Sequence, residues 1–171
     1  MIEITVYKRF GDPIAGTFLY LSIVCVGMQA IPISGHGSLD LGSRSDMIDA
    51  SHDRYDTIIT VDIEPIEPQG TLAYHWINMS DAGTTKRGSY DYSVFAYAAD
   101  TLVSALQRGH DVAIHCFVGR SRSVGVAIAA VAVIDDVSFQ AALDHVTRYR
   151  PQANAKPRIL NDAFDYTVDR R

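Results

Sequence analysis

Hydrophobic residues recur along this 171-residue chain with two periods, one typical of strands and one typical of helices. Short runs rich in β-branched and apolar residues predict buried strands at 55–63, 72–79 and 111–116. Longer segments with apolar residues at helical spacing predict helices at 93–109, 122–134, 139–149 and 157–168. Because strands alternate with helices, we expect an α/β fold in which helices flank both faces of a central, mostly parallel sheet.

The first 50 residues are expected to belong to the same single domain, 1–171, but their elements are harder to recognise. Residues 2–7 and 18–26 read as strands. The apolar run 14–33 is interrupted by polar residues, so a buried strand is favoured over a signal peptide or a membrane span. The polar stretch 34–46 predicts a surface loop.

Composition and charge argue against several classes of function. A formal net charge of -5 argues against general nucleic-acid binding. Two cysteines are too few for a disulfide scaffold, so we expect a cytoplasmic protein without membrane attachment. Cys25 lies in an apolar run and is interpreted as a core residue, with a redox partner of Cys116 as the alternative. Metal-ligand spacings and a Gly-rich nucleotide loop are both missing from the sequence, so no metal and no other cofactor is expected.

The stretch HCFVGRSRS, residues 115–123, separates a predicted buried strand from a predicted buried helix. In that position successive backbone N–H groups converge at a helix N-terminus and make an anion-binding nest. Gly119 permits the tight backbone path, and Arg122 can hold two phosphate oxygens in a bidentate fork. The predicted substrate-binding residues are Phe117, Val118, Gly119, Arg120, Ser121 and Arg122.

Cys116 is expected at the floor of this nest, where the field that attracts phosphate also stabilises a thiolate. We expect the thiolate to attack phosphorus and to form a phosphocysteine intermediate. The Ser123 hydroxyl can donate to the sulfur and assist its departure in the second step. His115 ends the strand and is expected to face away from the pocket and to donate to loop carbonyls. Arg120 is an additional cation that either contacts a multiply charged substrate or points outward.

The leaving oxygen in phosphoryl transfer needs a proton from a general acid. Asp81 in the segment NMSDAG follows a predicted strand and is the first choice. Asp91 in SYDYS is the alternative, and its other interpretation is a helix N-terminal residue. The same aspartate, protonated for the first step, can then serve as the base for the water that hydrolyses phosphocysteine.

This set of residues resembles the signature of the cysteine-based protein tyrosine phosphatase superfamily. The residues that carry it are His115, Cys116, Gly119, Arg122 and Ser123. Residues 119–123 match the form seen in the dual-specificity branch, and 137–154 are similar to the family's helix that ends in Arg-Pro and runs on to an asparagine. The resemblance covers about 57–164. It implies a central sheet flanked by helices, metal-free phosphomonoester hydrolysis, a Cys–Arg–Asp catalytic set, and a supporting role for Asn154.

The resemblance also implies a phosphorylated protein as substrate, with phosphotyrosine first and phosphoserine or phosphothreonine as further candidates. Ser80 precedes Asp81 where classical tyrosine-specific enzymes carry a Trp-Pro-Asp loop, and the chain is short for such a domain. Both departures favour a compact, shallow site. Phosphoinositides and RNA 5′ ends stay open as substrates. A phosphate-binding module with weak or no catalysis is a second function class, and a cysteine-loop enzyme of sulfur transfer or arsenate reduction is a third.

Overall fold

A computed structural model describes residues 27–34, 37–70, 73–81 and 91–170 of the chain. The strands predicted within the first 26 residues and the core position predicted for Cys25 therefore lie outside the described residues. Of the apolar run 14–33, the described end contains a short strand whose Ile31 is buried. None of the helices in the described ranges has both the length and the apolar character needed to cross a bilayer. The cytoplasmic location stays a prediction.

A five-stranded sheet forms the centre of the molecule, in the order β1-β2-β5-β3-β4. The strands are β1 Gln29–Ile31, β2 Leu39–Ser43, β3 Thr57–Val61, β4 Ala73–Ile77 and β5 Val112–Cys116. β1 pairs antiparallel with β2, and all other pairs are parallel. Every residue of β3 and β5 is buried, as expected for strands covered on both faces. The predicted mostly parallel sheet is confirmed.

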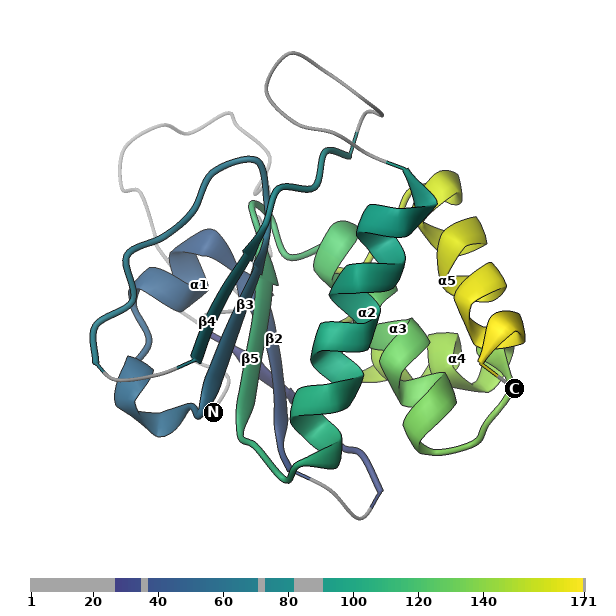
Figure 1. Ribbon diagram of the computed structural model, residues 1–171, viewed down its shortest axis with the longest axis horizontal. Helices are drawn as coiled ribbons and strands as arrows, with labels where there is room; N and C mark the ends of the chain where they lie inside the picture. Colours follow the sequence, from purple (N-terminus) through teal and green to yellow (C-terminus); the bar gives the residue numbers. More distant parts are fainter. Residues whose placement is uncertain (1–26, 35–36, 71–72, 82–90, 171) are drawn as a thin grey trace, which may run out of the picture.

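Helices cover both faces of this sheet, as predicted (Figure 1). They are α1 Arg44–Ile48, the 3-10 turn η1 His52–Arg54, α2 Tyr92–Gln107, α3 Arg122–Ile134, α4 Phe139–Tyr149 and α5 Pro157–Asp169. In Figure 1, α1 lies against one face and α2 to α5 gather on the other. A large apolar core fills the space beneath α2 to α5, and a smaller cluster around Met47, Tyr55 and Ile58 lies on the opposite side.

The surface loop predicted over residues 34–46 is wrong, because most of that stretch forms β2 and the start of α1. Leu39 and Leu41 are buried in the core, and Asp40 between them is buried too. Its carboxylate accepts hydrogen bonds from the Tyr55 hydroxyl at 2.8 Å and from Arg54 at 3.0 Å. Since a buried carboxylate is tolerated only when its partners are in place, the sequence SLDLGS could not reveal the strand by itself.

Helix α3 is the element that presents the candidate loop to the sheet. Ten of its residues after Arg122, from Ser123 to Ala132, are buried, because α3 packs against the sheet on one side and against α2, α4 and α5 on others. Gly125 keeps one of these contacts close: a Cβ there would lie 2.2 Å from Cγ2 of Ile159 in α5. The predicted buried helix is confirmed, and it fixes the end of the loop 116–121 firmly in the core.

Candidate active site

The loop from Cys116 to Ser121 joins the carboxyl end of the central strand β5 to the first turn of α3. Crevices at the carboxyl ends of parallel strands are where α/β proteins bind ligands. Cys116 is 2% exposed, and two donors point at its sulfur. The Gly119 N–H lies 3.3 Å from Sγ, and so does the Ser123 hydroxyl. The predicted contact between Ser123 and the sulfur is therefore present.

Gly119 is required by both conformation and space. Its φ of +68° lies in the left-handed region that favours glycine. A Cβ at this position would lie 2.5 Å from the Gly42 carbonyl oxygen and 2.5 Å from Nη2 of Arg150. The loop is thus pressed directly against β2 and against the end of α4.

Arg122 is buried at the start of α3 and held in one orientation. Its Nη1 donates to Oδ1 of Asp62 at 2.8 Å and to the Met79 carbonyl at 2.8 Å. Its Nε is buried and finds no hydrogen-bond partner among the described residues. A guanidinium whose Nη1 is fixed by hydrogen bonds, and whose Nε donor is still unused among the described residues, is suited to bind an oxyanion.

Asp62 was missed by the sequence reasoning and organises two arginines at once. It follows β3 directly, and its side chain is 1% exposed. Besides Arg122 it pairs with Arg44, whose Nη2 lies 3.0 Å from Oδ2. Arg44 also donates through Nη1 to the Pro65 carbonyl at 2.9 Å. Its position in the sequence could have identified Asp62, because an acidic residue immediately after a buried parallel strand lies at the ligand-binding edge of a sheet.

His115 is completely buried, and its ring faces β3. Nε2 lies 2.7 Å from the Thr60 hydroxyl, and Nδ1 is buried without a hydrogen-bond partner among the described residues. Burial disfavours the imidazolium and lowers the pKa of His115 from 6.5 to about 4, with the nearby Arg44 cation acting in the same direction. His115 is therefore neutral at physiological pH, and its contact with Thr60 links β5 to β3.

Asp81 lies against the phosphate loop. The Ser121 hydroxyl donates to its Oδ1 at 2.9 Å, and Nζ of Lys156 lies 3.4 Å from Oδ2. Asp91, the alternative general acid, instead caps α2, where its side chain accepts from the Val94 N–H at 3.1 Å. The structure thus brings Asp81 together with the predicted loop residues and places Asp91 in its other predicted role.

Two segments after α4 brace the loop from outside. Arg150, 2% exposed, donates through Nε to the Gly119 carbonyl at 3.1 Å and through Nη1 to the Leu41 carbonyl at 3.1 Å. Asn154 contacts the loop through its backbone, whose N–H donates to the Arg120 carbonyl at 2.8 Å. Arg120 in turn donates through Nε to the Gln152 carbonyl at 2.9 Å, so its side chain lies along this segment. Arg150 therefore supports the loop with a buried side chain, a role that the sequence analysis did not assign to it.

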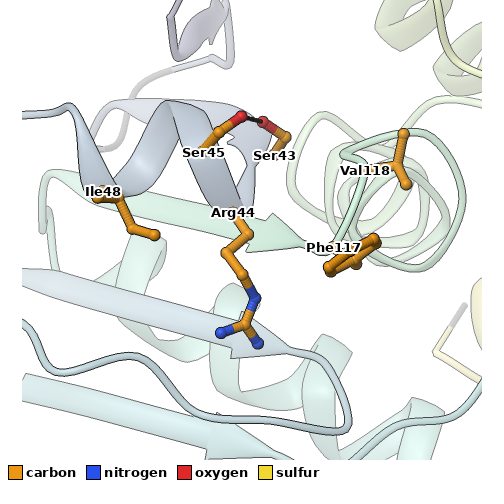
Figure 2. Close-up of a pocket in the computed structure, with 6 residues that line it drawn as sticks. All are labelled: Ser43, Arg44, Ser45, Ile48, Phe117 and Val118. Carbon is orange, nitrogen blue, oxygen red and sulfur yellow. Dashed lines mark hydrogen bonds between the residues drawn. The ribbon is translucent and has the colours of Figure 1, made fainter.

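A groove of about 410 Å³ opens between α1 and the loop. Figure 2 shows Ile48 and Arg44 extending from α1 and Phe117 and Val118 from the loop around this groove. Ile48, Phe117 and Val118 are all more than half exposed. The edge of the loop is therefore apolar on this side, while its floor is polar.

Residues 41–166 match the model of the family described as dual specificity phosphatase, catalytic domain. The chain belongs to this family. The family match begins earlier than the predicted resemblance over residues 57–164, and so includes the end of β2 and all of α1.

Among its relatives, this dual specificity phosphatase domain is 26% identical over 129 residues to dual specificity protein phosphatase 1 of Arabidopsis thaliana, covering 75% of the chain and 63% of the relative. It is 29% identical over 121 residues to dual specificity protein phosphatase 12 of Mus musculus, covering 66% of the chain and 34% of the relative. The crystal structure of DUSP15 superposes with a TM-score of 0.67 at 20% identity, covering 82% of this chain and 87% of the other. The fold of the dual specificity phosphatases is thus shared over most of the chain.

Proposed function

We propose that this domain is a metal-independent phosphomonoester hydrolase, a dual specificity protein phosphatase acting through a phosphocysteine intermediate. The observation that carries the proposal is the Cys116 sulfur, which receives two hydrogen bonds at the floor of a loop closed by the fixed guanidinium of Arg122. The Gly119 N–H and the Ser123 hydroxyl both donate to this sulfur, so both are in place to stabilise the negative charge that develops on it when it leaves phosphorus. Backbone N–H groups at the start of α3 and the free edge of Arg122 would bind the phosphate oxygens.

In the first step the Cys116 thiolate attacks phosphorus. The S–P bond forms, the bond from phosphorus to the leaving oxygen breaks, and protonated Asp81 gives its proton to that oxygen. In the second step a water oxygen attacks phosphorus and passes its proton to the Asp81 carboxylate. The S–P bond breaks, phosphate is released, and the Ser123 hydroxyl stabilises the departing thiolate from its position 3.3 Å from Sγ.

A phosphorylated protein fits the surface beside this site better than a phosphoinositide or an RNA 5′-triphosphate. The exposed residues next to the loop, Ile48, Phe117 and Val118, are apolar and can pack against the side chains that flank a phosphorylated residue. Arg44 and Arg120 already donate to protein carbonyl or carboxylate groups. A substrate with several phosphates would need more free cations at the edge of the loop than the described residues supply.

Hydrolysis of p-nitrophenyl phosphate by the wild-type chain and by Cys116→Ser tests this function directly. We expect wild-type turnover without added metal and in the presence of EDTA, and turnover at background level for the variant. No wild-type turnover, or equal turnover by Cys116→Ser, would favour the phosphate-binding module instead. A panel of phosphotyrosine and phosphothreonine peptides, a phosphoinositide and a 5′-triphosphate RNA then identifies the substrate class, and preference for either of the last two would overturn the protein assignment.

A further inference from the structure

Lys156 occupies an unfavourable position for a lysine. It is the N-cap residue of α5, immediately before Pro157, and its side chain makes no capping hydrogen bond. Helix N-termini carry partial positive charge, which disfavours a cation, and Ser, Thr, Asp and Asn are the residues preferred there. The position therefore costs the helix stability, and the contacts of the lysine lie elsewhere.

The side chain of Lys156 reaches the candidate general acid. Its Nζ lies 3.4 Å from Oδ2 of Asp81 and 3.3 Å from the Asp81 carbonyl oxygen. Its backbone N–H donates at 3.1 Å to the Ser121 hydroxyl, which donates its own hydrogen to Oδ1 of Asp81 at 2.9 Å. Both carboxylate oxygens of Asp81 are therefore held, one by the loop and one by the residue that begins α5.

The Ser121 hydroxyl also contacts Asp81 and does not cap its own helix. It is the N-cap of α3, yet it makes no side-chain cap, and the hydroxyl is aimed at Asp81. Ser121 and Lys156 are thus both N-cap residues without a side-chain capping hydrogen bond, and both side chains contact the Asp81 carboxylate. Both missing caps are explained if the two side chains serve to position the Asp81 carboxylate.

We propose that Lys156 is a positioning residue for Asp81, holding its carboxyl group above the phosphate loop where the leaving oxygen receives its proton. This inference rests on the proposed function, because it assigns Asp81 as the general acid. Lys156 acts through Asp81 and does not itself bind the substrate phosphate. The pair is partly open to solvent, with exposed fractions of 53% for Lys156 and 26% for Asp81, so its effect is moderate and weakens in high salt.

The test compares Lys156→Asn with wild type on two aryl phosphates. Asparagine is a preferred N-cap, so the variant removes the cation while improving the helix start. For phenyl phosphate, whose leaving phenol has a pKa of about 10 and depends on the acid, we expect kcat to fall about tenfold. For p-nitrophenyl phosphate, whose leaving phenolate needs little protonation, we expect a change of less than about twofold. The melting temperature is expected to stay the same or to rise, whereas a purely structural role for Lys156 would lower it.

Two further variants complete the design. In an Asp81→Asn background Lys156→Asn should cause no further loss, because both changes remove the same interaction. Lys156→Arg should restore most of the phenyl phosphate activity. Equal loss for both substrates, or loss that persists in the Asp81→Asn background, would show that Lys156 contacts the substrate phosphate and would overturn the proposal. Unchanged phenyl phosphate turnover in Lys156→Asn would overturn it as well.

A crystal structure of Lys156→Asn gives a readout that does not depend on turnover. We expect the Asp81 carboxylate to move away from Ser121, and an unchanged contact between the two would contradict the proposal even if the chain hydrolysed neither substrate. Failure of the proposed function is separately recognisable, because wild type and Cys116→Ser would then be equally inactive.

Discussion

The floor and the rim of the active site are built differently. The floor, which we define as Cys116, Arg122, Ser123, Asp62 and Arg150, is buried, and each of its members bonds to a residue far along the chain or across the loop. The rim, which we define as Asp81, Lys156, Arg120, Phe117 and Val118, is partly or largely exposed. Floor contacts therefore contribute to folding and to phosphate geometry together. We expect that rim contacts can change without unfolding the domain, and under the proposed function proton transfer and substrate choice depend on them.

Removing a floor residue should damage stability and activity together. Arg150→Met keeps the length of the side chain but leaves the carbonyls of Gly119 and Leu41 without their buried donor, and breaks the 3.3 Å pair with Asp46. We expect a loss of about 3–5 kcal/mol in the free energy of unfolding, because one partner of a buried pair is removed. Urea denaturation measures the stability, and kcat for p-nitrophenyl phosphate should fall in the same variant.

The matched control is Arg148→Met, an exposed arginine in the same helix. It should change the free energy of unfolding by less than about 0.5 kcal/mol. Equal effects at the two positions would mean that the floor is not braced by Arg150.

Changing a rim residue should affect catalysis alone. Asp81→Asn preserves the shape of the side chain but removes the proton donor, so we expect kcat for phenyl phosphate to fall by about 10²–10³ with little change in melting temperature. Asp91→Asn is the control, because asparagine also caps a helix and should preserve both α2 and the activity. If Asp91→Asn were the inactive variant, the general acid would be misassigned. A large drop in the melting temperature of Asp81→Asn would erase the distinction between floor and rim.

The smallest expected effect concerns His115, which lies beneath the floor. Its pKa falls from 6.5 in the unfolded chain to about 4 in the fold, because burial excludes the charged ring. Below pH 6.5 the unfolded state binds a proton that the native state does not, so stability is lost as the pH falls from 6.5 toward 4. From pH 6.5 to pH 5 this amounts to about 1.5 kcal/mol.

Urea denaturation over this pH range checks the His115 prediction. His115→Gln, which cannot titrate, should show a shallower loss of stability than wild type, whatever its absolute stability. Identical slopes for the two proteins would mean that the buried histidine does not contribute to acid sensitivity.

The sequence predicted those features whose interacting residues lie close together along the chain. The strand, loop and helix around Cys116 occupy one continuous stretch, so the local pattern was sufficient to predict β5, α3 and the contact between Ser123 and the sulfur. α4 was predicted for the same reason, and its start is also fixed locally, since the Ser138 hydroxyl accepts from the Ala141 N–H only three residues later. The alternation of strands and helices likewise predicted the parallel sheet.

The parts that escaped prediction depend on distant partners. β2 carries Asp40, whose burial is tolerated only because Tyr55 and Arg54 reach it from another segment. Asp62 is 60 residues from the arginine that it orients, and Lys156 is 75 residues from Asp81. Asn154, for which a supporting role was expected, donates its backbone N–H to the Arg120 carbonyl, 34 residues earlier in the chain. A local hydrophobic pattern cannot predict such contacts, because they form only when the order of the strands in the sheet brings distant segments together.

The fixed orientation of Arg122 has an entropic consequence. An arginine side chain that is free in solution loses about 2 kcal/mol of rotamer freedom when it is immobilised. Here the bonds from Nη1 to Asp62 and to the Met79 carbonyl impose that loss during folding, before any phosphate arrives. The guanidinium therefore meets its ligand already ordered, and the free energy of phosphate binding is not reduced by the cost of ordering it.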